Sequence, residues 1–190
     1  MKSLMDRLLR YGACVESRVW VIANNYKTES EAWQHCPRAD WMIWALKQIH
    51  YQDIKLRDYA IWCVESTPIH GKPLKYYMNK HTEELMEQIK SIKGTTIEEI
   101  EANSQKFREE WTKTYGAYGF SYPHPQEIKR AALNCLGTNV LRMAEENTDV
   151  IVEVAARLGM RYDHTYQAMA DQLRLILGNP FQDPATLSKT

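Results

Sequence analysis

The residues whose types could best support binding or catalysis lie in one stretch of the chain, between positions 33 and 44. This stretch places Arg38 two residues before Asp40 and surrounds the two charges with tryptophans, namely Trp33, Trp41 and Trp44. A guanidinium and a carboxylate form charge-assisted hydrogen bonds, and the face of an indole ring attracts a cation. Arg57 lies on the next expected helix, from which it would reach Arg38 and Asp40 if the two helices run antiparallel.

Two interpretations of these residues stay open. In the structural one, the tryptophans build a helical core, and Arg38 and Asp40, with Arg57 beside them, tie the helix of Trp41 to the next helix. In the functional one, the same three charged side chains form a pocket that binds an anionic or guanidinium-like group between tryptophan faces. We favour the structural interpretation and expect Trp41 and Trp44 to be largely buried, because they share one face of a helix.

Signatures of catalysis and of metal binding are missing from the sequence. The nearest approaches to a metal site are His81 with Glu84 and Asp163 with His164, and neither pair belongs to a clustered Cys/His pattern. No Walker loop, dinucleotide-binding glycine motif or nucleophile elbow occurs. We therefore expect no catalytic residue, no metal ion and no cofactor, and we predict that the chain is not an enzyme.

Charge and hydropathy argue against two further classes of partner. The 190 residues carry 24 basic and 24 acidic side chains, so no excess positive charge is available to bind a nucleic-acid backbone. The longest apolar run, residues 41–46, is far shorter than the ~20 residues that cross a bilayer. The first residues do not resemble a signal peptide, and the four cysteines are widely spaced, as free thiols are. We expect a protein of the cytoplasm, in a bacterial or phage-infected host cell.

Apolar residues recur with the helical period of 3.6 along nearly the whole chain, and no six-residue stretch alternates as a half-buried strand would. The predicted fold is all-α: a compact multi-helix bundle with an inserted antiparallel helical hairpin. We divide the chain into a tryptophan-rich helical part (residues 1–66), the hairpin (74–113), C-terminal helices that close one core with the first part (126–178), and a tail (179–190).

Capping signals predict where several helices begin and end. Thr28 and Glu31 form a capping box, in which each side chain accepts from a free amide at the start of a short helix. Pro37 suits the first position of the following helix, where no amide hydrogen is required. Gly159 is expected to end a short helix near the C-terminus.

Two apolar stripes define further helices. Val15, Val19 and Ile22 share one face of a helix that is expected to end near Asn25. A later helix is expected to continue through Gly137, on the stripe formed by Leu133, Leu136, Val140 and Met143. A glycine inside a helix costs up to ~1 kcal/mol relative to alanine, so this helix would be weak in its middle.

An aromatic, glycine-bearing loop follows the predicted hairpin. It holds four aromatic side chains in eight residues, Tyr115, Tyr118, Phe120 and Tyr122, interleaved with two glycines. Tyrosine is enriched at the hot spots of protein interfaces. A loop folded over the helical body would also account for these rings, but we predict that the four residues bind a partner.

The tryptophan-rich stretch and the end of the last helix also carry a resemblance. The residues that carry it are Trp33, Cys36, Arg38, Asp40, Trp41 and Trp44, together with Leu173, Arg174, Ile176 and residues 178–181. At these spacings the chain resembles a group of helical bacterial and phage proteins, some of which are described as immunity proteins of toxin systems. The resemblance covers about residues 12–66 and 167–182. It implies a helical scaffold that acts by binding, and it supplies no catalytic residue.

The middle of the chain departs from that group, whose members tend to have alanine-rich helices where this chain has its hairpin and aromatic loop. A shared partner therefore does not follow. We predict a non-enzymatic protein-binding module, immunity-like or a phage accessory protein, that docks on another protein and blocks it. The alternatives are a structural subunit of a larger assembly such as a virion, with the chain as a homo-oligomer, and an enzyme without a legible motif.

Overall fold

The computed structural model describes residues 3–94, 96–115, 123–137 and 139–182, apart from the side chains of residues 111–115 and 123–126. Over this part of the chain the prediction of an all-α fold is confirmed. The helices are α1 (Leu4–Arg10), α2 (Val15–Ala23), α3 (Glu29–His35), α4 (Ala39–Gln48), α5 (Lys55–Ser66), η1 (Leu74–Tyr77), α6 (Lys80–Ser91), α7 (Ile97–Tyr115), α8 (Pro123–Asn134), α9 (Val140–Arg157) and α10 (Tyr162–Leu177). Two short antiparallel strands, β1 (Pro68–Ile69) and β2 (Lys72–Pro73), join α5 to η1.

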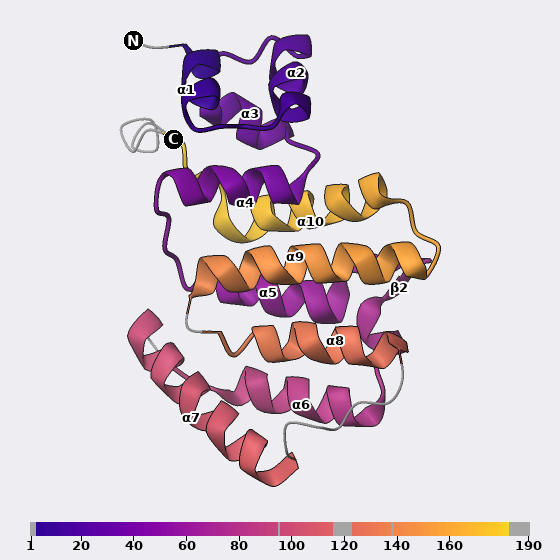
Figure 1. The fold of residues 1–190 in the computed structure, drawn as a ribbon. Coiled ribbons are helices and arrows are strands. Elements are labelled where there is room, and N and C mark those ends of the chain that lie inside the picture. Colours follow the sequence, from indigo (N-terminus) through magenta and orange to yellow (C-terminus); the bar gives the residue numbers. More distant parts are fainter. Residues whose placement is uncertain (1–2, 95, 116–122, 138, 183–190) are drawn as a thin grey trace.

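The helices are stacked in layers, as Figure 1 shows. At one end lie α1, α2 and α3; next come α4 and α10, then α5 and α9, then α6 and α8, and α7 lies at the opposite end. The central helix is α9, because it contacts α4, α5, α8 and α10. The end of α10 returns to the layers formed by the first helices, so the two ends of the described chain lie near each other.

One contiguous core runs through the stack from α3 to α10. Tyr59 of α5 is fully buried at its centre, where its hydroxyl group hydrogen-bonds to the hydroxyl of Thr148 on α9 at 2.9 Å. Asn147, also on α9, donates to the carbonyl of Ala60 at 3.1 Å. Buried polar groups need such partners, and each of these hydrogen bonds contributes ~1 kcal/mol net. α5 and α9 therefore form the centre on which the outer layers pack.

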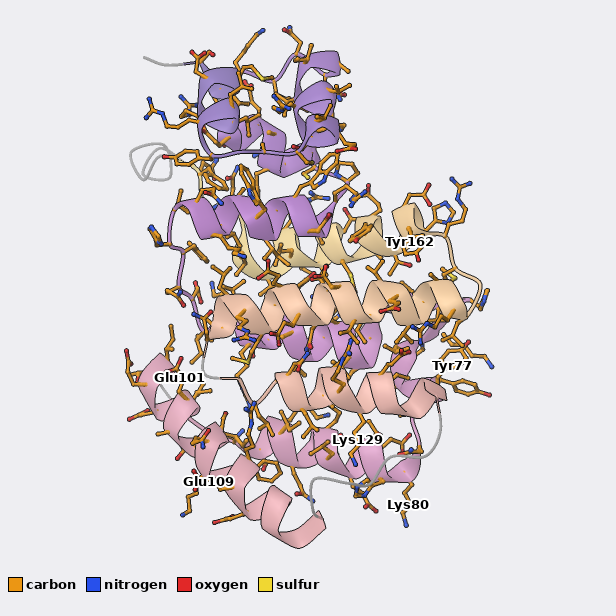
Figure 2. All side chains as sticks on the ribbon, viewed as in Figure 1. Tyr77, Lys80, Glu101, Glu109, Lys129 and Tyr162 are labelled. Carbon is orange, nitrogen blue, oxygen red and sulfur yellow. The ribbon has the colours of Figure 1, made fainter. Side chains whose placement is uncertain are left out.

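The segment predicted as a hairpin contributes to the same core. α6 buries Leu85, Met86 and Ile89 and lies against α8. Charged side chains such as Lys80 on α6 and Glu109 on α7 are exposed on the outer side (Figure 2). Ile97 and Phe107 of α7 also pack against this core, so the described part of the predicted hairpin shares its apolar interior with the rest of the bundle.

The prediction that one helix continues through Gly137 is wrong. The chain leaves α8 at Asn134 and begins α9 at Val140. A Cβ atom at position 137 would lie 2.8 Å from the Cγ of Met143 and 3.1 Å from the carbonyl oxygen of Asn134. Glycine thus allows the close turn between two helices. α9 then continues unbroken to Arg157, where we expected a separate short helix.

The capping predictions have mixed outcomes. The capping box of Thr28 and Glu31 is confirmed at the start of α3. Gly159 follows the end of α9 with a φ of 83°, a backbone conformation that glycine adopts without strain. Pro37 does not begin α4, since Arg38 is its N-cap and Ala39 its first residue.

Candidate functional site

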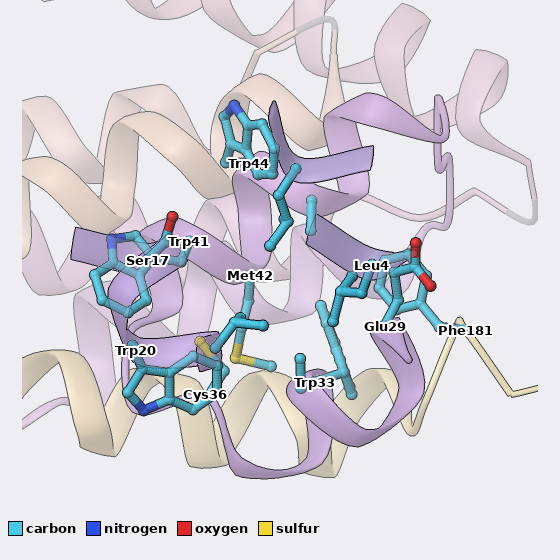
Figure 3. A pocket seen from close by; sticks show the side chains of 14 residues that line it. Leu4, Ser17, Trp20, Glu29, Trp33, Cys36, Trp41, Met42, Trp44 and Phe181 are labelled. Atoms are coloured by element: carbon cyan, nitrogen blue, oxygen red, sulfur yellow. The ribbon is translucent and has the colours of Figure 1, made fainter. Parts of the chain in front are cut away.

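The tryptophan-rich stretch lies where α1–α3 meet α4, around an apolar cavity (Figure 3). The cavity has a volume of about 80 Å³. Four indole rings line it, those of Trp20, Trp33, Trp41 and Trp44. Leu4 of α1, Met42 of α4 and Phe181 beyond α10 contribute further apolar walls. Residues from both ends of the chain therefore build this cavity.

A set of contacts that we call the clasp fastens α3 to the end of α10. Trp33 is only 3% exposed, and its Nε1 donates to the carbonyl of Gly178 at 2.7 Å. Nη1 of Arg174 donates to the carbonyls of Trp33 at 3.1 Å and Cys36 at 2.7 Å, at the end of α3 where helix carbonyls lack intrahelical donors. The ring of Phe181 packs 5.6 Å from that of Trp33. The clasp joins the two sequence segments that carry the resemblance.

Arg38 and Asp40 form an ion pair at the start of α4. The Nε and Nη2 of Arg38 donate to the two carboxylate oxygens of Asp40 at 2.9 and 2.6 Å, and this pairing raises the pKa of Arg38. The guanidinium carbon lies 4.1 Å from the ring centroid of Tyr166 on α10 and 5.1 Å from that of Trp41. Cation–π contacts contribute ~0.5–1 kcal/mol each at such partly exposed sites. The pair therefore links α4 to α10, where the sequence suggested a link to α5.

Arg57 does not join this pair. It lies on the side of α5 that faces α6, where its Nη2 donates to the carbonyl of Ile89 at 2.6 Å. The predicted cluster of Arg38, Asp40 and Arg57 therefore does not form. The functional interpretation in which all three line one pocket is wrong for the same reason.

Trp41 and Trp44 are half-buried, which is less than the sequence indicates. The side of α4 that enters the core carries Ala39, Met42, Ile43 and Leu46, each at most 1% exposed. The two tryptophans lie on a neighbouring side of the helix, which faces α1–α3. Each of them lines both the apolar cavity and a second hollow beside it.

This second hollow has a mixed polar and apolar lining and lies between the start of α2 and the start of α4. It has a volume of about 540 Å³, and its lining includes Cys14, Glu16, Arg38 and Asp40 as well as the two tryptophans. A hydrogen bond from its own backbone amide lowers the pKa of Glu16, which stays ionised at neutral pH. Since Arg38 and Asp40 neutralise each other, the hollow has a net negative charge.

The thiol of Cys14 differs from the other three. It is exposed at the N-cap of α2, where its Sγ accepts from the amide of Ser17 at 3.4 Å. Cys36, Cys63 and Cys135 are buried free thiols, and burial raises the pKa of Cys36 and Cys135 to about 12. Buried neutral thiols are unreactive, so Cys14 is the thiol within these described residues that a reagent can reach.

The outer side of α2 is an exposed apolar surface. Val15, Val19 and Ile22 are 61%, 57% and 65% exposed, and we call these three side chains the α2 stripe. Leu9 and Tyr11, at the end of α1, are 53% and 48% exposed. The sequence places the stripe on one helix face, but it does not determine whether that face points to the core or to solvent. In the structure α2 buries Val21 on its other side, which covers the cavity, and the stripe faces solvent. Within the described surface, large exposed apolar residues are concentrated in this segment.

The aromatic residues predicted to bind a partner lie outside this description. Tyr115 is the last residue of α7, but its side chain, and all of residues 116–122 with Tyr118, Phe120 and Tyr122, are outside the described part of the chain. That prediction therefore stays a prediction.

Among the described residues, no group of three His, Cys, Asp or Glu side chains is placed to hold a metal ion. No helix in the same part of the chain is long and apolar enough to span a membrane. Comparisons with protein-family models, with curated proteins and with solved structures find no match.

Proposed function

We propose that this chain is a binding protein that docks on another protein through the α2 stripe. The observation that carries the proposal is the exposure of Val15, Val19 and Ile22 together on one helix face. Soluble proteins rarely leave a set of neighbouring large apolar side chains in water unless a partner covers them. The second hollow adjoins α2, and its half-buried Trp41 and Trp44 are of the residue type most enriched at hot spots.

The charges beside the stripe indicate the chemistry of the partner. Arg10 and Arg18 flank the exposed apolar residues, and neither takes part in any ion pair among the described residues. We infer a partner surface that is apolar and bordered by carboxylates. A second copy fits less well, because an antiparallel α2 pair centred on Val19 would place Arg18 next to Arg18 of the other copy, and like charges repel.

A protein of this kind acts by occupying a surface of its partner, as an immunity protein or a phage accessory protein of the cytoplasm does. The stripe supplies apolar area and the hollow receives one projecting side chain. A basic side chain suits the hollow, because Glu16 provides a carboxylate and the tryptophans provide ring faces for a cation. No chemical step is required of the chain.

The test compares three forms of the full chain. In the stripe variant, Val15, Val19 and Ile22 are all replaced by serine, whose helix propensity is close to that of valine and isoleucine. In the matched control, Leu175→Ser and Tyr162→Ser change two exposed apolar residues of α10, which are 78% and 58% exposed. Circular dichroism and the thermal midpoint should be the same for all three, because each side chain is in water.

We expect the wild type and the control to capture the same protein from bacterial extracts, and the stripe variant not to capture it. With that protein purified, the stripe variant should bind about thirtyfold more weakly or worse, the effect of losing a hot spot of ~2 kcal/mol. Equal affinity of all three forms contradicts the proposal. Self-association that the stripe variant alone loses, measured by sedimentation, also contradicts it and identifies a second copy as the partner.

A further inference from the structure

Arg57 is a buried cation without a counter-ion. Its residue is 6% exposed, and none of the ion pairs formed by the described residues includes it. Burying a charge is costly unless the charge is paired and hydrogen-bonded, so arginines this deep normally have a carboxylate partner. Burial accordingly lowers the pKa of Arg57 from its ordinary value.

The contacts of Arg57 leave part of its guanidinium unsatisfied. Nη2 donates to the carbonyl of Ile89, in the last turn of α6, where the helix dipole favours a cation. Nε is covered and has no hydrogen-bond acceptor. A guanidinium has five N–H donors. Since the carbonyl of Ile89 is the one acceptor that the described residues provide, the guanidinium can donate further hydrogen bonds to a ligand.

The same side chain lines a groove between α5 and α6. The groove has a volume of about 290 Å³, and Ile61 and Trp62 form its apolar wall. Lys90, at its edge, is already engaged by Glu65 at 2.9 Å and Glu87 at 2.6 Å. Asp58 follows Arg57 on α5 at the exposed rim, where partial desolvation raises the pKa of its carboxyl group.

We propose that this groove binds a small organic carboxylate, whose anionic group is held by Arg57 and whose apolar part lies against Ile61 and Trp62. A carboxylate would provide charged acceptors for the guanidinium N–H groups that the carbonyl of Ile89 leaves unused. The carboxylates of Asp58 and Glu65 in the lining repel a second negative charge, which favours a monoanion over phosphate. The groove lies in layers of the stack away from α2, so ligand binding there can be tested independently of docking through the α2 stripe (Figure 1).

The test uses benzoate as the probe, with benzamide as a neutral molecule of the same shape and inorganic phosphate as an anion without an apolar part. Binding is followed in the ¹H–¹⁵N spectrum at the Nε–H of Arg57 and the indole N–H of Trp62. The signals are assigned by their loss in Arg57→Lys and Trp62→Phe. We expect benzoate to shift both signals along one saturating curve, and benzamide and phosphate to leave them in place at equal concentration.

Two variants complete the test. Arg57→Lys retains the charge but not the planar fork, and it should weaken benzoate binding, read at the Trp62 signal, by about tenfold or more. Lys55→Gln removes a cation from the same helix outside the groove and should leave the affinity unchanged. The proposal is overturned if benzoate moves neither wild-type signal, if benzamide or phosphate moves them as strongly, or if Arg57→Lys binds as tightly as the wild type.

Discussion

Replacing Trp33 by alanine should release α1–α3 from the bundle while the core of α5 and α9 stays folded. The buried residues of α1 and α2, Leu4 and Val21, lie outside the contiguous core, whereas Trp33 belongs to it. Trp33 is thus a principal apolar contact between the N-terminal helices and the rest of the fold. Because the hydrogen bond between Tyr59 and Thr148 joins α5 and α9, in another layer of the stack than α1–α3, the perturbation should stay local (Figure 1).

The size of the effect follows from the burial of the side chain. Truncating a buried tryptophan to alanine costs ~3–5 kcal/mol. The lost hydrogen bond to Gly178 adds little, because that residue is exposed and water can replace the donor. We therefore take the lower end, about 3 kcal/mol, and since 1.4 kcal/mol is a factor of ten, the population of the open form should rise roughly 150-fold.

Hydrogen exchange read by mass spectrometry measures this directly. Peptides from α1–α3 should exchange about a hundredfold faster in Trp33→Ala, and the slowest amides of α9 should keep their rates. Trp62→Ala, which shortens a half-buried tryptophan of α5, is the control and should not accelerate α1–α3. The reasoning is refuted if exchange in α1–α3 is unchanged, or if α9 accelerates to the same extent.

Three further predictions follow from the packing, the thiols and the charges. Gly137→Ala should lower the free energy of unfolding by ~1–3 kcal/mol in a denaturant titration, because its Cβ would overlap Met143; a glycine inside one continuous helix would give the opposite sign. In the native protein at pH 8, iodoacetamide should modify Cys14 and spare the three buried thiols, which become reactive only on unfolding; mass spectrometry of the peptides would show any other order. Asp149 is exposed, but partial desolvation of its carboxyl group and the nearby carboxylates of Glu145 and Asp40 raise its pKa, so its charge mildly opposes folding at neutral pH. Asp149→Asn should raise the thermal midpoint slightly at pH 7, and the gain should shrink as the pH falls through the raised pKa and be gone below the ordinary carboxyl pKa.

Local signals in the sequence predict local structure well. The capping box of Thr28 and Glu31 is formed by neighbouring residues, so its chemistry is complete in the sequence. Helical periodicity likewise predicts the all-α class, because it depends on residues three and four apart. Gly137 shows the limit of this reasoning. Glycine is needed there because a Cβ atom would overlap Met143 across the turn, and helix propensities do not include such a contact.

The candidate site depends on contacts that periodicity does not determine. The α2 stripe has the spacing of a core-facing helix, but this spacing does not determine whether another element covers the stripe. In the structure none of the described elements covers it. Arg57 could be placed on the helix after Arg38, yet which side of α5 faces α4 is set by the packing of α6 and α9. The clasp joins Trp33 to Gly178 across 145 positions of the chain, beyond the reach of any local pattern.

The most direct test of the central claim places a photo-crosslinking amino acid at Val19, at Leu175 or at Tyr118 in three otherwise identical chains. Val19 is in the α2 stripe, Leu175 on α10 is more exposed still (78% against 57% for Val19), and Tyr118 represents the aromatic loop predicted from the sequence. After irradiation in bacterial cells, a partner on the stripe gives one covalent adduct of defined mass from the Val19 chain and none from the Leu175 chain. An adduct from Tyr118 or Leu175, with none from Val19, would contradict the assignment of the α2 stripe as the docking surface.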